Sequence, residues 1–556
     1  MSSLKKDLLK YTPRKEQSDV LDFIKKTKTD NPGNKFFLLN MPTGSGKSHL
    51  ALMISNFYVN EVDKTAKVDI ITAGKILQDQ YSDTYESISN LKGKENYSCS
   101  QYATSCGSGK EFNKLNKSKC DFCPHDDAKI SYINNRVSLT NFHLYLIHAL
   151  YNERIMEQRN SKVLIVDECH ELDDVMSDFI SIKITENIVK RLKFTNEDDI
   201  LKALKKVKNI SDYINFLNYL DGEILQTIED IDKSMQGGRS PKQDKRDTRL
   251  SKILGTGPNA DIKLMQIIAD LKQYKTKIDI FLKEYKENPH NWVLETYHNE
   301  KTNQKELSLE PIWAYDYLDK YVWSNYDMVI LMSGTILDKN LFSELNGLDI
   351  DKTVYYSVPS PFPIEHRPIY YMPLGKMSYA KKEETFKNYV SYIHKILKKY
   401  ESQKGIIHTN SFELSNWIQR AVENPRLVFH DSSTRDEMLR KHFETTDPTV
   451  FVSPSVSTGV SFDHERSRFQ VIAKIPYPSL GSQKNKMRQK NNPEWYSWKT
   501  VCELLQMCGR SIRSKTDYAD TIIIDGSFSD ILRYSSHLIP NWMQDSIKKI
   551  EVKTNV

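Results

Sequence analysis

The segment Pro42–Ser48 carries glycine, lysine and serine in an order that suits phosphate binding, although Met41 replaces the first glycine of the usual pattern. Glycines let successive backbone N–H groups converge on phosphate oxygens. The Lys47 ammonium would reach the β- and γ-phosphates, and the Ser48 hydroxyl would hold magnesium. We predict a site for ATP and magnesium, with a chance match in a surface loop as the alternative. The expected nucleotide-binding residues are Pro42, Thr43, Gly44, Ser45, Gly46, Lys47 and Ser48.

An acidic pair, Asp167 and Glu168, follows the apolar run 163–166. Asp167 would bind magnesium through water, and Glu168 would orient and deprotonate the water that attacks the γ-phosphate. A lone acidic pair after a strand is more often part of a solvated loop. Because this pair accompanies a phosphate-binding segment, we predict that both residues are catalytic.

Three further polar residues near the C-terminus suit phosphate chemistry. Gln506, Arg510 and Arg513 lie four and three positions apart, so they would share one face of a helix. Arginine side chains offered to a γ-phosphate supply positive charge as the transition state develops. We predict a catalytic role for all three, the alternative being an amphipathic surface helix.

Four of the seven cysteines are crowded into 25 positions, at Cys99, Cys106, Cys120 and Cys123. Four thiolates suit zinc and an iron–sulfur cluster equally well, and the spacing alone favours zinc. The same region mixes lysines, for phosphates, with aromatic rings, for base stacking, which is typical of single-strand binding. A solvated basic loop is the alternative. These residues are Lys92, Lys94, Lys110, Lys114, Lys117, Lys119, Tyr97, Tyr102 and Phe112.

The elements that must position these residues form an α/β pattern. Short apolar runs end in polar residues, which predicts parallel strands with ligand sites at their carboxyl ends. The first series is 35–40, 68–72, 163–166 and 329–332, and the second is 405–409, 426–429, 449–452, 470–473 and 521–524. We therefore predict two α/β domains with parallel sheets.

Two regions interrupt this pattern. Residues 96–130 show little periodicity, whereas 176–290 repeat apolar residues at helical spacing, broken by glycine- and proline-bearing segments at 237–241 and 255–258 that predict a loop. We expect 292–296 and 307–311 to form a hairpin that returns the chain to the first sheet.

The bulk composition is that of a folded protein with several domains. The chain has 556 residues, 39% of them hydrophobic, and a net charge of +6, which tolerates a polyanionic partner without demanding one. It lacks both an apolar stretch of about 18–20 residues and a signal-peptide core. We therefore expect a soluble, intracellular protein without membrane contact, whose clustered thiols bind metal and do not form disulfides.

Taken in order, these motifs resemble the XPD/DinG-type iron–sulfur helicases of superfamily 2. The resemblance covers about residues 11–526 and is weak only in the helical region. The segments that match the family's landmarks are Arg14–Gln17, Thr72–Gln80, Leu91–Cys99, Cys120–Pro124, Thr140–His143, Ser333–Thr335, Ser360–Phe362 and Gln506–Arg513. At Thr458–Ser461 the two acidic residues of the family's motif V are missing, which puts coupling between DNA and ATP at that point in doubt.

The resemblance implies a motor that consumes ATP. It adds Gln17 to the nucleotide-binding residues, favours a 4Fe-4S cluster on the four cysteines, and implies 5′→3′ travel of a monomer along single-stranded DNA at forked duplex DNA. The expected domains are a first RecA-like domain (1–95, 131–175 and 291–345), an iron–sulfur insert (96–130), a helical arch (176–290) and a second RecA-like domain (346–556).

Three alternatives share part of this pattern. A translocase that displaces proteins or remodels RNA would carry every motif without separating duplexes. A zinc-binding regulatory module with a relic nucleotide pocket is disfavoured because Lys47, Glu168 and Arg513 are intact. A nuclease would need a separate acidic metal cluster, which the sequence does not offer.

Overall fold

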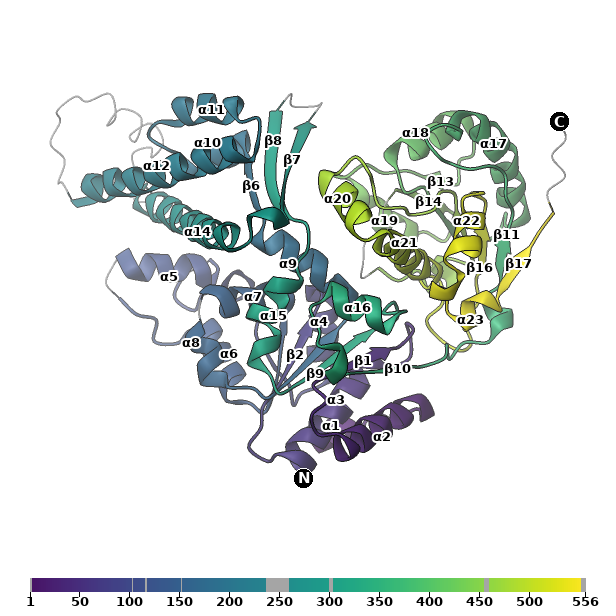
Figure 1. Cartoon of the computed structure of the whole chain (residues 1–556), viewed down its shortest axis with the longest axis horizontal. Helices are drawn as coiled ribbons and strands as arrows, with labels where there is room; N and C mark the ends of the chain where they lie inside the picture. Colours follow the sequence, from purple (N-terminus) through teal and green to yellow (C-terminus); the bar gives the residue numbers. More distant parts are fainter. Residues whose placement is uncertain are drawn as a thin grey trace.

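Two parallel sheets, each with helices around it, organise the chain (Figure 1). The computed structural model describes residues 3–102, 104–115, 118–151, 153–236, 260–299, 304–454 and 460–551. The predicted loop segments at 237–241 and 255–258 lie outside these ranges. No helix in the described part of the chain is long and apolar enough to cross a lipid bilayer.

The first sheet has seven parallel strands, and its middle strands are wholly buried apolar runs. Because β9 lies between β1 and β5, the ends of these three strands meet at one edge, with Asn40 opposite Ser333 and Asp167 opposite Met332. The strand order is β10 (Thr353–Ser357), β1 (Phe36–Asn40), β9 (Met328–Ser333), β5 (Val163–Asp167), β2 (Val68–Thr72), β4 (Val137–Asn141) and β3 (Ser89–Asn90).

The second sheet also has seven parallel strands, so the prediction of two α/β domains is confirmed. Its order is β13 (Leu427–Val428), β14 (Val450–Ser453), β12 (Gly405–His408), β15 (Phe469–Ile472), β16 (Asp520–Ile523), β11 (Ile369–Tyr371) and β17 (Ile547–Lys549). The helices α17 (Lys382–Lys399), α18 (Phe412–Ala421) and α19 (Arg435–Glu444) belong to this domain.

Two details differ from the sequence prediction. Strand β10 pairs with β1, so the first sheet continues beyond the boundary expected at residue 345. The predicted hairpin forms as β7 (Trp292–Asn299) and β8 (Gln304–Pro311), and the chain then returns to the first sheet at β9 as expected, but the hairpin itself does not pair with that sheet. It pairs instead with β6 (Ile182–Thr185), because β6 offers apolar residues that pack with the buried face of β8.

The helical region rises above the first sheet, on the side away from the N-terminus (Figure 1). It contains α10 (Glu186–Leu192), α11 (Glu197–Lys206) and the long pair α12 (Ile210–Gln236) and α14 (Ala260–Glu287). The apolar stripe of α14 is buried as predicted, and the lysine that interrupts it, Lys275, pairs with Asp221 of α12 at 2.9 Å. The cysteine-bearing region holds two further helices, α5 (Cys106–Leu115) and α6 (Pro124–Asn134), and α5 lies against α14.

A buried ion pair between Arg159 and Asp69 stabilises the end of the first sheet that faces away from the phosphate-binding segment. Arg159 is fully buried and donates from Nε to Asp69 Oδ1 and from its terminal nitrogens to the carbonyls of Val68 and Asn135. The Tyr326 hydroxyl donates to the other oxygen of Asp69 at 2.8 Å. Every strong donor of Arg159 therefore has a partner, which is the condition under which a buried charge is tolerated.

Asp69→Ala should lower the free energy of unfolding of the first domain by about 3–5 kcal/mol, because it leaves the Arg159 guanidinium buried without its counter-charge. Urea unfolding followed by circular dichroism measures this loss. The matched control is Asp327→Ala, which removes an exposed pair with Lys162 at 3.5 Å and should cost about 0.5 kcal/mol or less. Equal losses in the two variants would contradict this account of Arg159.

Candidate active site

The phosphate-binding segment joins β1 to α3 (Lys47–Phe57), the strand–loop–helix order that the motif needs. Gly44 and Gly46 have φ of +79° and +83°, a left-handed conformation that favours glycine. A Cβ at Gly44 would also collide with the ring of Phe362, so this loop has no room for a side chain there. The N-terminus of α3 therefore opens toward the loop, where its backbone N–H groups suit an anion.

Gln17, on α2 (Lys15–Asp30), braces this loop. Its amide Nε2 donates to the Gly46 carbonyl at 2.8 Å, and its Oε1 accepts from the Arg14 backbone N–H at 2.8 Å. The Arg14 guanidinium donates to the Gly44 carbonyl. Gln17 and Arg14 thus each hold one glycine carbonyl of the loop, and nucleotide binding by Gln17 stays a prediction.

The acidic pair lies opposite the loop lysine. The Lys47 ammonium is 2.9 Å from Glu168 Oε1, and the Tyr81 hydroxyl donates to Asp167 Oδ2 at 2.9 Å. Burial and the neighbouring Glu168 raise the pKa of Asp167 to about 6. Burial opposes the ionisation of Glu168, but the neighbouring Lys47 ammonium outweighs it and lowers the pKa of Glu168. Glu168 is therefore a carboxylate at neutral pH, as a proton acceptor must be.

The C-terminal motif reaches the same place from the second domain, but not on one helical face. Helix α21 (Pro493–Cys508) ends one residue before Gly509, whose N–H donates to the Leu505 carbonyl at 2.9 Å. Gln506 lies in the last turn of α21, whereas Arg510 and Arg513 lie beyond it. The prediction of a shared helical face is therefore wrong, because the helix stops at the glycine.

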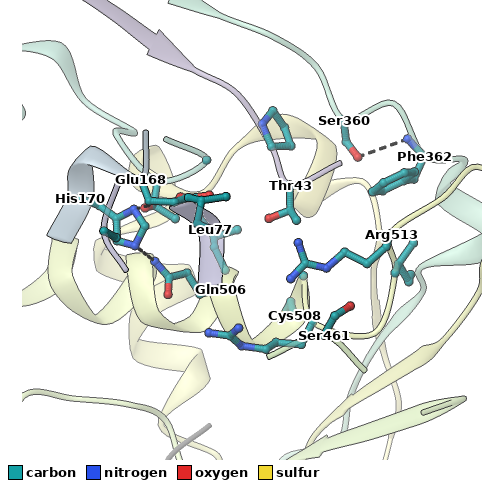
Figure 2. A pocket seen from close by; sticks show the side chains of 18 of the residues that line it. Thr43, Leu77, Glu168, His170, Ser360, Phe362, Ser461, Gln506, Cys508 and Arg513 are labelled. Atoms are coloured by element: carbon teal, nitrogen blue, oxygen red, sulfur yellow. Dashed lines mark hydrogen bonds and ion pairs between the residues drawn. The ribbon is translucent and has the colours of Figure 1, made fainter. Parts of the chain in front are cut away.

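Both arginines line a cavity of about 700 Å³ between the two domains. Burial lowers the pKa of Arg510 to about 10 and lowers that of Arg513, so both stay charged at neutral pH. Figure 2 shows the Arg513 side chain pointing toward Thr43 of the phosphate-binding segment. Lining residues come from both domains and include Pro42, Thr43, Glu168, Gln506, Arg510 and Arg513.

His170 links the two sides of this cavity, a contact that sequence reasoning did not assign. Its Nε2 contacts the amide nitrogen of Gln506 (Figure 2), and its Nδ1 lies 2.8 Å from Ser333 Oγ. Burial lowers the pKa of His170 to about 4, so the ring is neutral. Because the Gln506 amide can only donate to it, Nε2 accepts and the proton lies on Nδ1, which donates to Ser333. The only sequence signal was the position of His170, two residues after Glu168.

The segment expected to depart from the usual motif V is described only in part. Thr458 and Gly459 lie outside the described residues. The Val460 carbonyl accepts from Arg510 at 3.0 Å, and Ser461 lines the cavity with Arg513 (Figure 2). This chain therefore presents a neutral hydroxyl to the cavity at position 461.

The four predicted cysteine ligands lie in one insert, where Cys106 and Cys120 each interact with both Cys99 and Cys123. Burial and the neighbouring thiols raise the pKa of both Cys106 and Cys120. Within the described ranges, no three histidine, cysteine or acidic side chains form a group that could hold a metal ion. The structure thus brings the four thiols into one neighbourhood within the insert.

Some of the predicted basic residues around the cysteines already have acidic partners. Lys92 pairs with Asp79, and Lys110 pairs with Asp126 at 2.5 Å. These two lysines are therefore less available to a phosphate than the sequence suggests. The side chains of Phe112, Lys114 and Lys117 lie outside the described residues.

Comparison with protein families finds two matches along the chain. The family described as Helicase C-terminal domain matches residues 393–546, and the one described as Type III restriction enzyme, res subunit, matches residues 10–202. Among characterised relatives, a probable ATP-dependent helicase of Methanocaldococcus jannaschii is 23% identical over 609 residues, which covers 91% of each protein.

Solved structures show the same fold. An XPD helicase aligns over 97% of this chain and 100% of its own length, with a TM-score of 0.61 and 16% identity. An Xpd structure from S. tokodaii aligns over 97% and 100%, with a TM-score of 0.57 and 15% identity. The resemblance to XPD/DinG-type helicases of superfamily 2 is confirmed, and the matches to helicase sequences support an ATP-hydrolysing helicase.

Lys47→Ala and Glu168→Gln should each reduce ATP turnover by at least 10²-fold, for different reasons. Loss of the ammonium removes a contact to the β- and γ-phosphates, so nucleotide affinity should fall as well. The glutamine keeps the shape of Glu168 but cannot accept a proton, so affinity should remain. Steady-state ATPase assays and titration with a fluorescent ADP analogue separate these effects. Near-parental turnover in either variant would refute the assignment.

Proposed function

We propose that this chain is an ATP-dependent DNA helicase that moves 5′→3′ on single-stranded DNA and separates forked duplexes. The main support is the cavity that Glu168 of the first domain lines together with Arg510 and Arg513 of the second, with Lys47 paired to Glu168 at 2.9 Å. A site divided in this way couples nucleotide binding to closure of the two domains, since phosphates bound by the first domain attract the arginines of the second.

The residues around the cavity divide the chemistry among them. Lys47 would exchange its contact with Glu168 for the phosphates, which frees the Glu168 carboxylate to accept a proton from the attacking water. Ser48 and Asp167 would hold magnesium, which neutralises phosphate charge when bound. Arg510 and Arg513 would stabilise charge in the transition state. The contact between His170 and Gln506 would form when the domains close, and it would thereby link closure to the position of the acidic pair.

Single-stranded DNA is supported as the substrate by the surface near the cysteines. Phe122 lies between two of the thiols with 58% of its surface exposed, and Lys94 and Lys119 carry no resolved acidic partner among the described contacts. An exposed ring suits base stacking, and lysines suit the phosphate backbone. The 5′→3′ direction and the monomeric state rest on the resemblance to the XPD/DinG-type helicases.

The four thiols fit a bound cluster by their chemistry and position. Cys106 is the first residue of α5 and Cys123 is the N-cap residue of α6, so both thiols lie at helix N-termini. The Asn113 amide nitrogen lies 2.8 Å from Cys120 Sγ, and a side chain at Gly109 would collide with Cys99. The family resemblance favours a 4Fe-4S cluster over zinc. When bound, the cluster would cross-link a segment with little apolar core of its own.

We expect ATPase activity to be stimulated by single-stranded DNA, with affinity falling steeply as salt rises because bound counterions are released. A forked duplex with a 5′ tail should be unwound faster than one with a 3′ tail. A helicase assay with both substrates, run with Glu168→Gln as the inactive control, tests this. Stimulation by duplex RNA alone would exclude the proposal, and stimulation without strand separation would favour a translocase that remodels protein or RNA complexes.

Cys120→Ser and Cys123→Ser should lose iron and strand separation while keeping measurable ATPase activity, because the thiols lie outside the nucleotide cavity. Iron content, the absorbance of anaerobically purified protein and unwinding rates measure the effect. Cys502→Ser is the matched control, since Cys502 is buried on α21, far along the chain, and should keep iron. Parental unwinding by an iron-free variant would show that the cluster has no mechanical role.

A further inference from the structure

The helix that follows the acidic pair forms ion pairs with the second domain. Helix α9 (Leu172–Ile180) begins four residues after Glu168, and its first turn carries Asp173. The two carboxylate oxygens of Asp173 accept from the terminal nitrogens of Arg488, at 2.6 and 3.1 Å. This is the two-pronged geometry in which an arginine–carboxylate pair is strongest and most directional.

Arg488 belongs to α20 (Gln483–Asn491) of the second domain, yet most of its partners are in the first. It is 2% exposed, and its Nε donates to the Ile312 carbonyl. Its guanidinium lies 5.0 Å from the ring of Trp313 and 5.3 Å from that of Trp495. Such complete enclosure by one carboxylate, one carbonyl and two rings fixes the orientation of the side chain.

The neighbouring contacts connect Arg488 to the catalytic motif of the second domain. The Asn492 N–H donates to the Arg488 carbonyl at 2.8 Å, and Asn492 Oδ1 accepts from the Trp495 N–H at 3.1 Å. Asn492 therefore caps the end of α20 and the start of α21, and it fixes the angle between the two helices. Lys499 of α21 then pairs with Asp174 at 2.8 Å. The start of α9 therefore holds α20 and α21, and α21 leads directly to Gln506 and the arginines.

We propose that Arg488 and Asp173 form an interdomain clamp that positions Arg510 and Arg513 against Glu168. The inference rests on the proposed function, because it assigns Arg488 a role through those arginines. Asp173 and Glu168 lie on one short segment, and α21 connects Arg488 to the arginines, so a shift of either partner changes the spacing across the cavity. Arg488 and Asp173 are thus positioning residues and do not contact the phosphates themselves.

Arg488→Met is the appropriate test variant. Methionine keeps an unbranched side chain between the two rings, and the Asp173 left behind has 20% of its side chain exposed, so water can solvate it. Asp173→Ala is less suitable, because it would leave a fully buried guanidinium without a counter-charge and endanger folding. We expect Arg488→Met to lower kcat for ATP by about 10–100-fold, while affinity for a fluorescent ADP analogue changes by less than about 3-fold, since the phosphate-binding segment is untouched.

A double-mutant cycle with Arg513→Ala decides whether Arg488 acts through the arginines. If it does, Arg488→Met should lower kcat by a smaller factor in the Arg513→Ala background than in the parent, because part of the stabilisation that it removes is already absent. Additive losses in kcat, or parental kcat in Arg488→Met, would overturn the clamp. Parental kcat in Arg513→Ala alone would instead overturn the proposed role of Arg513, so the two failures are distinguishable.

Two controls separate positioning from a general loss of structure. Lys490→Met removes a charge from an exposed position on the same helix and should leave kcat unchanged. Asp173→Glu keeps a carboxylate for the Arg488 guanidinium and should therefore retain more kcat than Arg488→Met. If all variants on α20 lower kcat, ADP affinity and thermal midpoint together, the effect is structural and the clamp is refuted.

Discussion

Burial of positive charge between the two domains is the constraint on which this structure depends. Arg510 and Arg513 lose most of their hydration in the cavity, yet no carboxylate forms an ion pair with either of them among the described residues. Burying unpaired charges is unfavourable, so other contacts between the domains must supply the free energy that keeps these arginines in place. Apolar packing of α21 against the first domain and the polar contacts at Asp173, Asp174 and His170 provide it.

The inserted regions leave this arrangement intact because they do not separate the strands that carry the nucleotide-site residues. The cysteine-bearing segment lies between β3 and β4 at one edge, and the helical region enters after α9 and returns before β9. Strands β1, β9 and β5, which set the spacing between Lys47 and the acidic pair, remain direct neighbours. Long insertions in such connections cost little stability, so new surfaces can be added without disturbing the site.

Local patterns predicted the parts of this fold that local physics decides. The buried apolar runs identified the strands, and glycine placement identified the loop of Gly44 and Gly46. Contacts between residues far apart in the chain were not predictable: Arg488 and Asp173 are 315 positions apart, and His170 meets Gln506 across 336. Such contacts depend on how finished elements pack, which periodicity does not encode. The predicted helical face of Gln506, Arg510 and Arg513 failed for a local reason, the stop at Gly509, that the sequence did contain.

The serine at position 461 follows from the same charge balance. The resembled motif has a carboxylate there, which would lie beside the buried arginines and partly neutralise them. In this chain the Ser461 hydroxyl adds no charge, and the neighbouring Val460 carbonyl supplies a neutral acceptor for Arg510 at 3.0 Å. The cavity therefore keeps its positive potential for a polyphosphate, while the arginine stays oriented. Holding the arginines then depends more heavily on contacts outside the cavity, which is where the interdomain ion pairs are found.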